Sequence, residues 1–102
     1  NFMFLAMNRF KIKVGYEKLF EKIWRERDSH LEEVPGFLEF SLMRGDSNDE
    51  FTLFASHTIW SSRVDFSNWT KSEAFKLAHK DAGKHRDMYL GPPVFESFEK
   101  VI

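Results

Sequence analysis

Residues 66–80 read FSNWTKSEAFKLAHK and contain two helical patterns that follow one another. The first pattern carries Phe66 and Trp69. Glu73 follows Thr70 by three residues, which is the spacing of a capping box and predicts the start of a second helix. We therefore expect one helix to end shortly after Trp69 and a second helix to run to the end of this stretch.

The second helix of this stretch carries a candidate metal ligand. Phe75 and His79 are four residues apart, so they lie one above the other on the same helix face. The break between the two helices can turn Trp69 toward the space in front of His79. An imidazole that faces a pocket beside aromatic rings can bind the iron of a flat aromatic cofactor. The alternative is that His79 is a packed histidine and that the aromatic rings belong to the core.

A strand with one buried face is predicted within residues 3–14, where apolar and polar side chains alternate clearly from Asn8 onward. Phe10, Ile12 and Val14 share one side of this strand, and Asn8 has the same parity. A polar amide is therefore predicted to point inward, where it costs about 1–3 kcal/mol unless it finds a partner. Asn8 either bonds to nearby backbone or points into a cavity at a ligand.

The rest of the chain alternates between helical and strand patterns. A helix over residues 16–27 is predicted by a stripe of Leu19, Phe20, Ile23, Trp24 and Arg27. Trp24 lies at the edge of this stripe and is either core or a pocket wall. The remaining predicted elements are strands at 37–44 and 51–60 joined by a polar turn at 45–50, a helix opened by the capping-box pattern from Ser62 to Asp65, and a last strand at 94–102.

Two weaker candidate sites lie elsewhere in the chain. His57 lies within the predicted strand 51–60 and is expected to be partly buried, and such histidines usually find a backbone or side-chain partner. The basic residues that follow the second helix are Lys80, Lys84, His85 and Arg86. They either complement the dipole of a solvated helix end or form a rim that meets the carboxylates of a ligand.

The element order predicts a β-α-β-β-α-β chain with a broken second helix, which is the ferredoxin-like α+β fold. We expect a single domain over residues 3–102, because a chain of this length fits one domain. Helices on one face of an antiparallel sheet leave the other face uncovered. That face is expected to be apolar here, so a homodimer that packs sheet on sheet is predicted.

The composition argues against several classes of function. The chain has 102 residues, no cysteine and a net charge of −1. The lack of cysteine excludes disulfides, thiolate metal sites and thiol nucleophiles. The mixed charge argues against a nucleic-acid partner, and no apolar run is long enough to cross a membrane. The apolar start of the chain is too short for a signal peptide, so the cytoplasm is the expected location.

Three stretches of this sequence resemble a known family. They are AMNRF at residues 6–10, the pair Trp60 and Trp69, and SEAFKLAHK at residues 72–80. The chain is similar to the antibiotic-biosynthesis-monooxygenase type of dimeric α+β barrel. It is similar more closely to the haem-degrading monooxygenases of the IsdG type, and among them to the proteobacterial HmuQ/HmuD branch. The resemblance covers nearly the whole chain.

The resemblance implies roles for three residues. His79 matches the axial ligand of the haem iron, and Asn8 matches the amide that donates a hydrogen bond near the iron-bound oxygen. Trp69 matches the bulky residue that presses on the macrocycle and ruffles it. Haem would then be both cofactor and substrate. The other residues expected to contact haem are Trp24, Phe66 and Phe75.

The implied reaction is oxygen-dependent degradation of haem to a bilin-type product with release of iron. Electrons are expected from a separate reductase, because nothing in the sequence resembles a flavin or nicotinamide site. One alternative is a cofactor-free monooxygenase of polycyclic, polyketide-like phenols, in which Asn8 and Trp69 contact the substrate and His79 holds no iron. Another is a haem carrier that uses the same His79 ligation without turnover.

Overall fold

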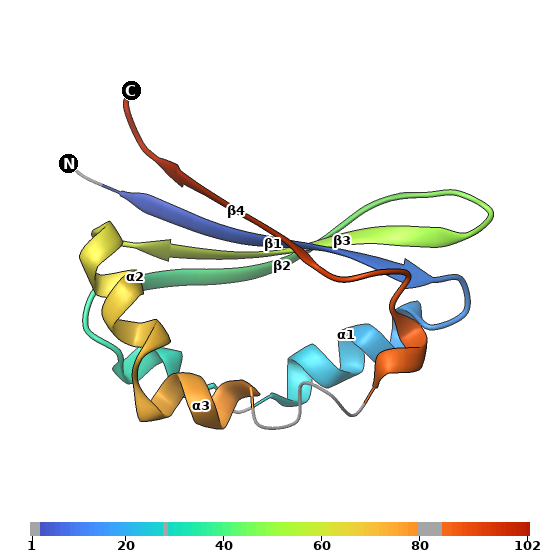
Figure 1. Ribbon diagram of the computed structural model, residues 1–102, viewed down its shortest axis with the longest axis horizontal. Coiled ribbons are helices and arrows are strands. Elements are labelled where there is room, and N and C mark those ends of the chain that lie inside the picture. The colour runs from blue at the N-terminus through green and yellow to red at the C-terminus, as the bar shows by residue number, and fades with distance from the viewer. Residues whose placement is uncertain (1–2, 28, 80–84) are drawn as a thin grey trace.

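The computed structural model describes residues 3–27, 29–79 and 85–102, and its elements follow the predicted ferredoxin-like order with the second helical region divided in two (Figure 1). None of the helices in these ranges is long and apolar enough to span a membrane. The elements are β1 (Phe4–Lys13), α1 (Glu17–Glu26), the 3-10 helix η1 (Leu31–Glu33), β2 (Phe37–Ser47), β3 (Phe51–Trp60), α2 (Arg63–Thr70), α3 (Glu73–His79), the 3-10 helix η2 (Arg86–Met88) and β4 (Val94–Glu99).

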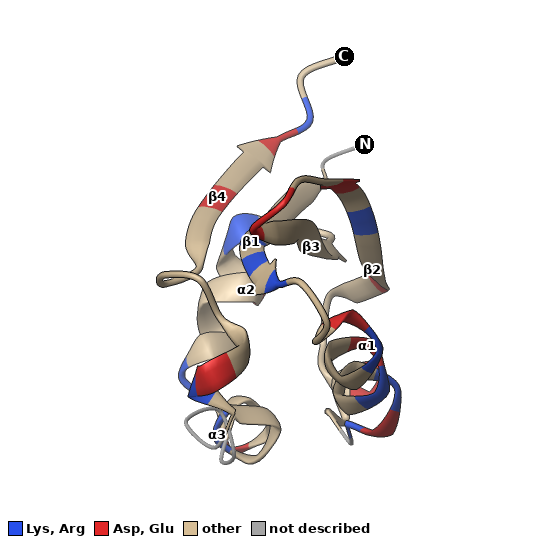
Figure 2. Cartoon of the chain, turned by 90° about the vertical axis from the view of Figure 1, so that its right-hand side faces the viewer, with Lys and Arg blue, Asp and Glu red and all other residues tan. Residues whose placement is uncertain are grey.

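The four strands form one antiparallel sheet in the order β2-β3-β1-β4. Helices α1, α2 and α3 lie on one face of this sheet, and no described element covers the other face (Figure 2). In the central strand, Asn8 is paired with Ser56 of β3 on one side and with Phe95 of β4 on the other. Because paired residues of neighbouring strands point to the same face, these three side chains lie side by side under the helices.

The core consists of two clusters on the helix-covered face of the sheet. The cluster beside α2 contains Phe4, Ala6, Leu31, Trp60 and Trp69. The cluster beside α1 contains Phe10, Ile12, Phe20, Phe54 and Met88. Full burial of a side chain such as Phe10 or Ile12 stabilises the fold by about 1.5–3 kcal/mol. The two clusters therefore fix α1 and α2 at separate places on the sheet.

The C-terminal end of β1 differs from the predicted strand. β1 begins at Phe4, because the backbone pairs with β3 from Phe4 opposite Trp60 onward. Val14 was predicted to point inward, but it lies outside β1 and is 54% exposed. The reason is the turn at Gly15, whose φ of 98° is a conformation that glycine adopts without a steric penalty.

Three other sequence-based expectations need correction. β2 continues to Ser47, because a register shift after Arg44 lets Ser47 pair with Thr52. β4 ends at Glu99, where its pairing with β1 also ends, so residues 100–102 lie beyond the strand. Leu19 was predicted on the buried stripe of α1, but it is 40% exposed because it lies at the edge of that stripe.

A polar network joins the start of α1 to the β2–β3 hairpin. The Thr52 hydroxyl donates to Glu17 Oε2 at 2.8 Å, and the Gly15 N–H donates to Glu17 Oε1 at 2.8 Å. The hydroxyl of Ser47 lies 2.9 Å from that of Thr52. These bonds, led by the one from Thr52, hold the pKa of Glu17 below its ordinary value of 4.5.

Candidate active site

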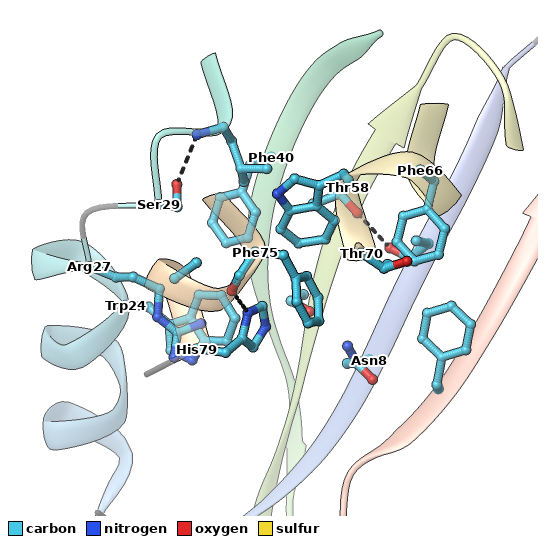
Figure 3. A pocket seen from close by; sticks show the side chains of 16 residues that line it. Asn8, Trp24, Arg27, Ser29, Phe40, Thr58, Phe66, Thr70, Phe75 and His79 are labelled. Carbon is cyan, nitrogen blue, oxygen red and sulfur yellow. Dashed lines mark hydrogen bonds between the residues drawn. The ribbon is translucent and has the colours of Figure 1, made fainter. Parts of the chain in front are cut away.

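A cavity of about 580 Å³ lies between the sheet and the helices (Figure 3). Residues of all four strands and of α1, α2 and α3 line it. Its volume is within the range of about 300–1,000 Å³ that is usual for small-molecule and cofactor sites. The described residues that line it include six Trp and Phe rings, namely those of Trp24, Phe40, Phe66, Trp69, Phe75 and Phe95. Such a lining suits a flat apolar ligand.

The cavity brings together the side chains that the sequence singled out. Those that line it are Asn8, Trp24, Phe66, Trp69, Phe75 and His79. They come from β1, α1, α2 and α3, and are therefore far apart in the chain. Their functional roles stay predictions, but they share one hollow.

Ser72 makes the break between α2 and α3. The Phe75 N–H donates to Ser72 Oγ at 3.2 Å, and the Ser72 hydroxyl donates to the Trp69 carbonyl at 2.6 Å. The same serine therefore caps the start of α3 and holds the end of α2. Thr70 was predicted to be this cap and is not. It is the last residue of α2, and its hydroxyl donates to the Ser67 carbonyl at 2.7 Å.

The start of α2 lies at the predicted position. The Asp65 N–H donates to Ser62 Oγ at 3.1 Å, and the Ser62 hydroxyl lies 3.0 Å from Asp65 Oδ2. Ser62 is therefore the N-cap of α2, but the Asp65 carboxylate accepts from the Ser62 hydroxyl and not from the Ser62 backbone N–H, so only half of the predicted capping box forms. Both ends of α2 are thus fixed by serine hydroxyls, which orients the face that carries Phe66 and Trp69 toward the cavity.

His79 is the last residue of α3, and its ring is held on two sides. Its Nδ1 lies 2.8 Å from the Phe75 carbonyl oxygen (Figure 3). A carbonyl oxygen can only accept, so Nδ1 carries the proton and, in the neutral ring, Nε2 keeps its lone pair. The ring also stacks on that of Phe75, with centroids 4.1 Å apart and an angle of 29° between the planes. The imidazole is thereby prepared to bind a metal through Nε2.

Trp69 forms a wall that is fixed by its neighbours. It is 8% exposed, and its ring meets that of Phe75 edge to face with centroids 4.8 Å apart. The centroid of its ring also lies 5.3 Å from that of Trp60 and 6.0 Å from that of His79. Its indole nitrogen is buried and has no hydrogen-bond partner among the described residues. A packed row of rings therefore runs from the core to His79.

Asn8 is a half-buried amide on the sheet side of the cavity (Figure 3). Within the described part of the chain its side chain has no hydrogen-bond partner, so the predicted alternative of a bond to nearby backbone is not observed. An amide N–H and an amide carbonyl are both left for a ligand or water. An amide donor beside a pocket can stabilise negative charge that develops on a bound group.

Two polar residues on the floor of the cavity were not predicted. Ser56 and Thr58 lie on the helix-covered side of β3, and the Thr58 hydroxyl donates to the Ala6 carbonyl at 3.4 Å. Their parity in β3 is the signal that could have revealed them. His57 has the opposite parity: it is partly buried, as predicted, but it lies on the open face of the sheet and does not line the cavity.

Other unpredicted lining residues come from outside the central stretch. The Arg27 guanidinium lies 4.1 Å from the centre of the Trp24 ring and supplies a cation to a largely aromatic cavity. Phe95 stacks on Phe66 with centroids 5.8 Å apart and planes at 10°. The predicted helical stripe over residues 16–27 already contained Arg27, which directly follows α1. Its position in the cavity, however, depends on where α1 packs on the sheet.

The predicted basic rim is only partly described. Lys80 and Lys84 lie outside the described residues. His85 and Arg86 are exposed, and neither is among the described residues that line the cavity. Their contact with ligand carboxylates stays a prediction.

The chain is similar to a known family and to several named proteins. The sequence pattern of a family described as antibiotic biosynthesis monooxygenase matches residues 3–81. A staphylobilin-producing heme oxygenase of Staphylococcus epidermidis is 32% identical over 85 residues, which are 83% of this chain and 81% of that protein. A heme-degrading monooxygenase of Bacillus cereus is 32% identical over 89 residues, which are 86% of this chain and 81% of that protein. Membership of the HmuQ/HmuD branch stays a prediction.

Solved structures share the fold. MhuD, a heme-degrader of Mycobacterium tuberculosis solved with two hemes bound in its active site, has a TM-score of 0.73 and 26% identity, and the match covers 97% of this chain and 96% of that one. A Bacillus cereus protein described as an antibiotic biosynthesis monooxygenase has a TM-score of 0.77 and 19% identity, covering 98% and 94% of the two chains. The second likeness shows the fold alone.

Proposed function

Because the chain belongs to the antibiotic biosynthesis monooxygenase family, we propose that it degrades haem with dioxygen to a bilin-type product and releases the iron. Relatives at 32% identity are named as haem-degrading enzymes. The observation that carries the proposal is the contact between the His79 ring and the Phe75 carbonyl oxygen. His79 Nδ1 donates to the Phe75 carbonyl at 2.8 Å, which leaves Nε2 to bind iron from the wall of an aromatic cavity.

The residues of the cavity fit haem in three respects. The lining is aromatic and apolar, as a porphyrin requires. His79 offers one neutral nitrogen from the helix side. Asn8, on the sheet side, offers an amide that is unpartnered among the described residues. The cavity between these two elements would hold the macrocycle, with His79 to bind its iron and Asn8 to meet dioxygen.

Bound haem would supply the iron that activates dioxygen and the porphyrin carbon that is oxidised. His79 would hold the iron through Nε2, and the Phe75 carbonyl would keep the imidazole in the required tautomer. Asn8 would orient dioxygen by donating a hydrogen bond from its amide. Trp69 is backed by Trp60 and cannot recede, so it would press on the macrocycle and distort it.

We also propose where the electrons come from and where the enzyme acts. The reaction consumes electrons, and the chain has no sequence motif of a flavin or nicotinamide site. A separate reductase would therefore supply them. Such a partner and a haem supply are both compatible with the cytoplasm, where we propose that the enzyme acts.

We further propose that the active form is a homodimer. The open face of the sheet, which points away from the helices, carries apolar side chains. Three of them, Met43, Val94 and Phe98, are between 50% and 54% exposed. The ion pair between Arg9 and Glu96, at 3.6 Å, lies on the same face. An exposed apolar sheet face of this kind is typical of an interface, and a second copy would cover it.

A haemin titration tests the proposal. Haemin is added to the protein while the Soret band is followed, and ascorbate is then added in air with catalase present. We expect saturable binding followed by loss of the Soret band and growth of a bilin-like band, whose product mass spectrometry identifies. A Soret band that persists, also with a reductase as electron donor, would indicate a haem carrier. No saturable binding would contradict the haem proposal and favour polycyclic phenolic substrates.

A matched pair of variants identifies the ligand. His79→Ala should weaken ferric haem binding at least about tenfold, which is about 1.4 kcal/mol, and abolish turnover. Added imidazole should restore part of the binding. Leu77→Ala truncates an exposed side chain of the same helix and should behave as the wild type. Normal haem degradation by His79→Ala would show that another group holds the iron.

A further inference from the structure

Two hollows of this protein share a wall. Beside the main cavity, a groove of about 390 Å³ lies between α1 and β2. Trp24 of α1 and Phe40 of β2 line both the cavity and the groove. The other residues that line the groove are Glu21, Arg25, Leu42, Arg44 and Phe54. The Trp24 and Phe40 rings, which we call the Trp24–Phe40 wall, therefore separate the two spaces.

The wall is a stacked aromatic pair. The two ring centroids are 5.4 Å apart, and their planes differ by 12°. Each ring comes from a different element, so the pair bridges the space between α1 and the edge strand β2. Phe40 points to the helix-covered face because it is paired with Thr58 of β3, which has that parity. Figure 3 shows both residues on the same side of the cavity as Arg27.

Trp24 is anchored in the core. Its ring contacts those of Phe10 and Phe20, with centroids 5.9 Å and 6.1 Å away. Phe10 and Phe20 are 7% and 0% exposed, so they are fixed themselves. The Arg27 guanidinium lies over the Trp24 ring at 4.1 Å. The indole is therefore held by packing on several sides, and the wall has a fixed position rather than a hinged one.

The groove behind the wall has charged side chains at its edge and apolar side chains at its floor. Arg44 and Arg25 both pair with Glu21, at 3.1 Å and 3.3 Å. Arg44 also interacts with the Glu17 carboxylate at the start of α1, so the two guanidinium groups are shared between two carboxylates. Leu42 and Phe54 supply apolar surface. The groove opens to solvent past Arg25 and Arg44, whose side chains are 74% and 63% exposed, so the wall sets the volume of the cavity and not the access to the groove.

We propose that the Trp24–Phe40 wall limits this chain to one haem per cavity, and that removal of either ring joins the groove to the cavity and admits a second haem. The inference rests on the proposed function. The heme-degrader MhuD has been solved with two hemes in its active site, so this fold can hold two. In the present chain the stacked pair lies between the cavity and the groove, so the two volumes are not joined into one space that could hold two macrocycles.

Measuring the number of haems bound per chain tests the role of the Trp24–Phe40 wall. Haemin is titrated into each protein, and the number bound per chain is read from the Soret end point and from native mass spectrometry. We expect one haem per chain for the wild type and two for both Trp24→Ala and Phe40→Ala. Trp24→Phe keeps a ring that can stack and should bind one. The matched controls Leu19→Ala on α1 and Leu38→Ala on β2 truncate exposed side chains outside both hollows and should bind one.

Several outcomes would overturn the inference. They are two haems on the wild type, one haem or none on both alanine variants, or a second haem on either control. A crystal structure of haem-free Phe40→Ala gives a readout that does not depend on haem binding. We expect one continuous hollow in it, whereas a groove still closed by another side chain would contradict the inference. A wild type that binds no haem, together with a joined hollow in this variant, would contradict the proposed function and leave the wall itself supported.

Discussion

The half-buried amide of Asn8 is a group whose role can be separated from its contribution to stability. Within the described ranges it has no hydrogen-bond partner, so its truncation removes no native bond. Asn8→Ala should change the free energy of unfolding by no more than about 0.5 kcal/mol. If the amide stabilises charge on dioxygen, the same variant should lower the rate of haem degradation by about 100-fold while haem affinity stays close to that of the wild type.

Stopped-flow decay of the Soret band and urea unfolding measure the two effects. The exposed amide of Asn68, on α2, provides a matched control, and Asn68→Ala should change neither quantity. An Asn8→Ala enzyme that turns over at the normal rate would assign Asn8 to the fold rather than to the reaction. A large loss of stability would show that the amide makes a bond in solution.

Glu17 links the stability of the fold to pH. Hydrogen bonds from Thr52 and from the backbone of Gly15 lower its pKa below 4.5. A carboxylate whose pKa is lower in the folded than in the unfolded state stabilises the fold above the unfolded pKa. This stabilisation is lost as the pH falls through the lower, folded value. Glu17→Gln should therefore be less stable than the wild type at pH 7, and the difference should disappear in acid, once the pH is below both values.

Urea unfolding of the two proteins at a series of pH values measures this difference. Glu26→Gln, an exposed position of the same helix, should leave the profile unchanged. A constant difference between Glu17→Gln and the wild type at all pH values would show that the carboxylate charge is not the cause.

At the scale of an element, Ser72 decides how α2 and α3 meet. Its hydroxyl accepts from the Phe75 N–H and donates to the Trp69 carbonyl, so it positions two residues of the cavity wall. Ser72→Ala should lower the free energy of unfolding by about 0.5–2 kcal/mol, as loss of an N-cap does. It should also weaken haem binding, because α3 carries His79. Ser72→Asp keeps an acceptor at the cap and should recover most of the stability.

Chemical denaturation and a haemin titration on the same samples test this coupling. Ser67→Ala, in the middle of α2, is the control for loss of a serine hydroxyl outside the cap. Unaltered haem affinity in Ser72→Ala, despite lower stability, would show that the position of His79 does not depend on the cap.

Local sequence patterns predicted the elements well and their junctions less well. Alternation in β1 placed Asn8 on the helix-covered side, and the spacing of Phe75 and His79 placed both rings on one face of α3. The helix break was expected, but its cap was assigned to Thr70 instead of Ser72. Both residues offer a hydroxyl near Glu73, and only the backbone path after Trp69 decides which of them reaches the free N–H groups.

The rest of the cavity depends on tertiary contacts that local patterns do not contain. Ser56 and Phe95 lie beside Asn8 only because of the pairing register of β3 and β4 with β1. Phe40 faces Trp24 only because α1 packs beside the edge strand β2. Sequence periodicity gives the face of each residue within its own element, whereas the neighbours across elements follow from sheet order and helix packing.

At the scale of the whole molecule, the sheet separates two surfaces of different composition. The helix-covered face holds the cavity, and the open face carries half-exposed apolar side chains such as Val94 and Phe98. A specific interface usually buries about 1,200–2,000 Å² in total. A second copy packed on the four-stranded sheet would supply such an area without closing the cavity, which opens on the opposite side.

Phe98→Glu tests this arrangement, because Phe98 is 50% exposed and is paired with Leu5 on the open face. A carboxylate placed between two sheets would be buried without a partner, so the variant should shift the protein from dimer to monomer, raising the dissociation constant by at least about 100-fold. Sedimentation equilibrium over a range of protein concentrations measures it. Val64→Glu changes an apolar residue that is 65% exposed on α2 and should leave the dimer intact. A wild type that is monomeric at all concentrations, or a dimer that Phe98→Glu leaves unchanged, would contradict dimerisation through this face.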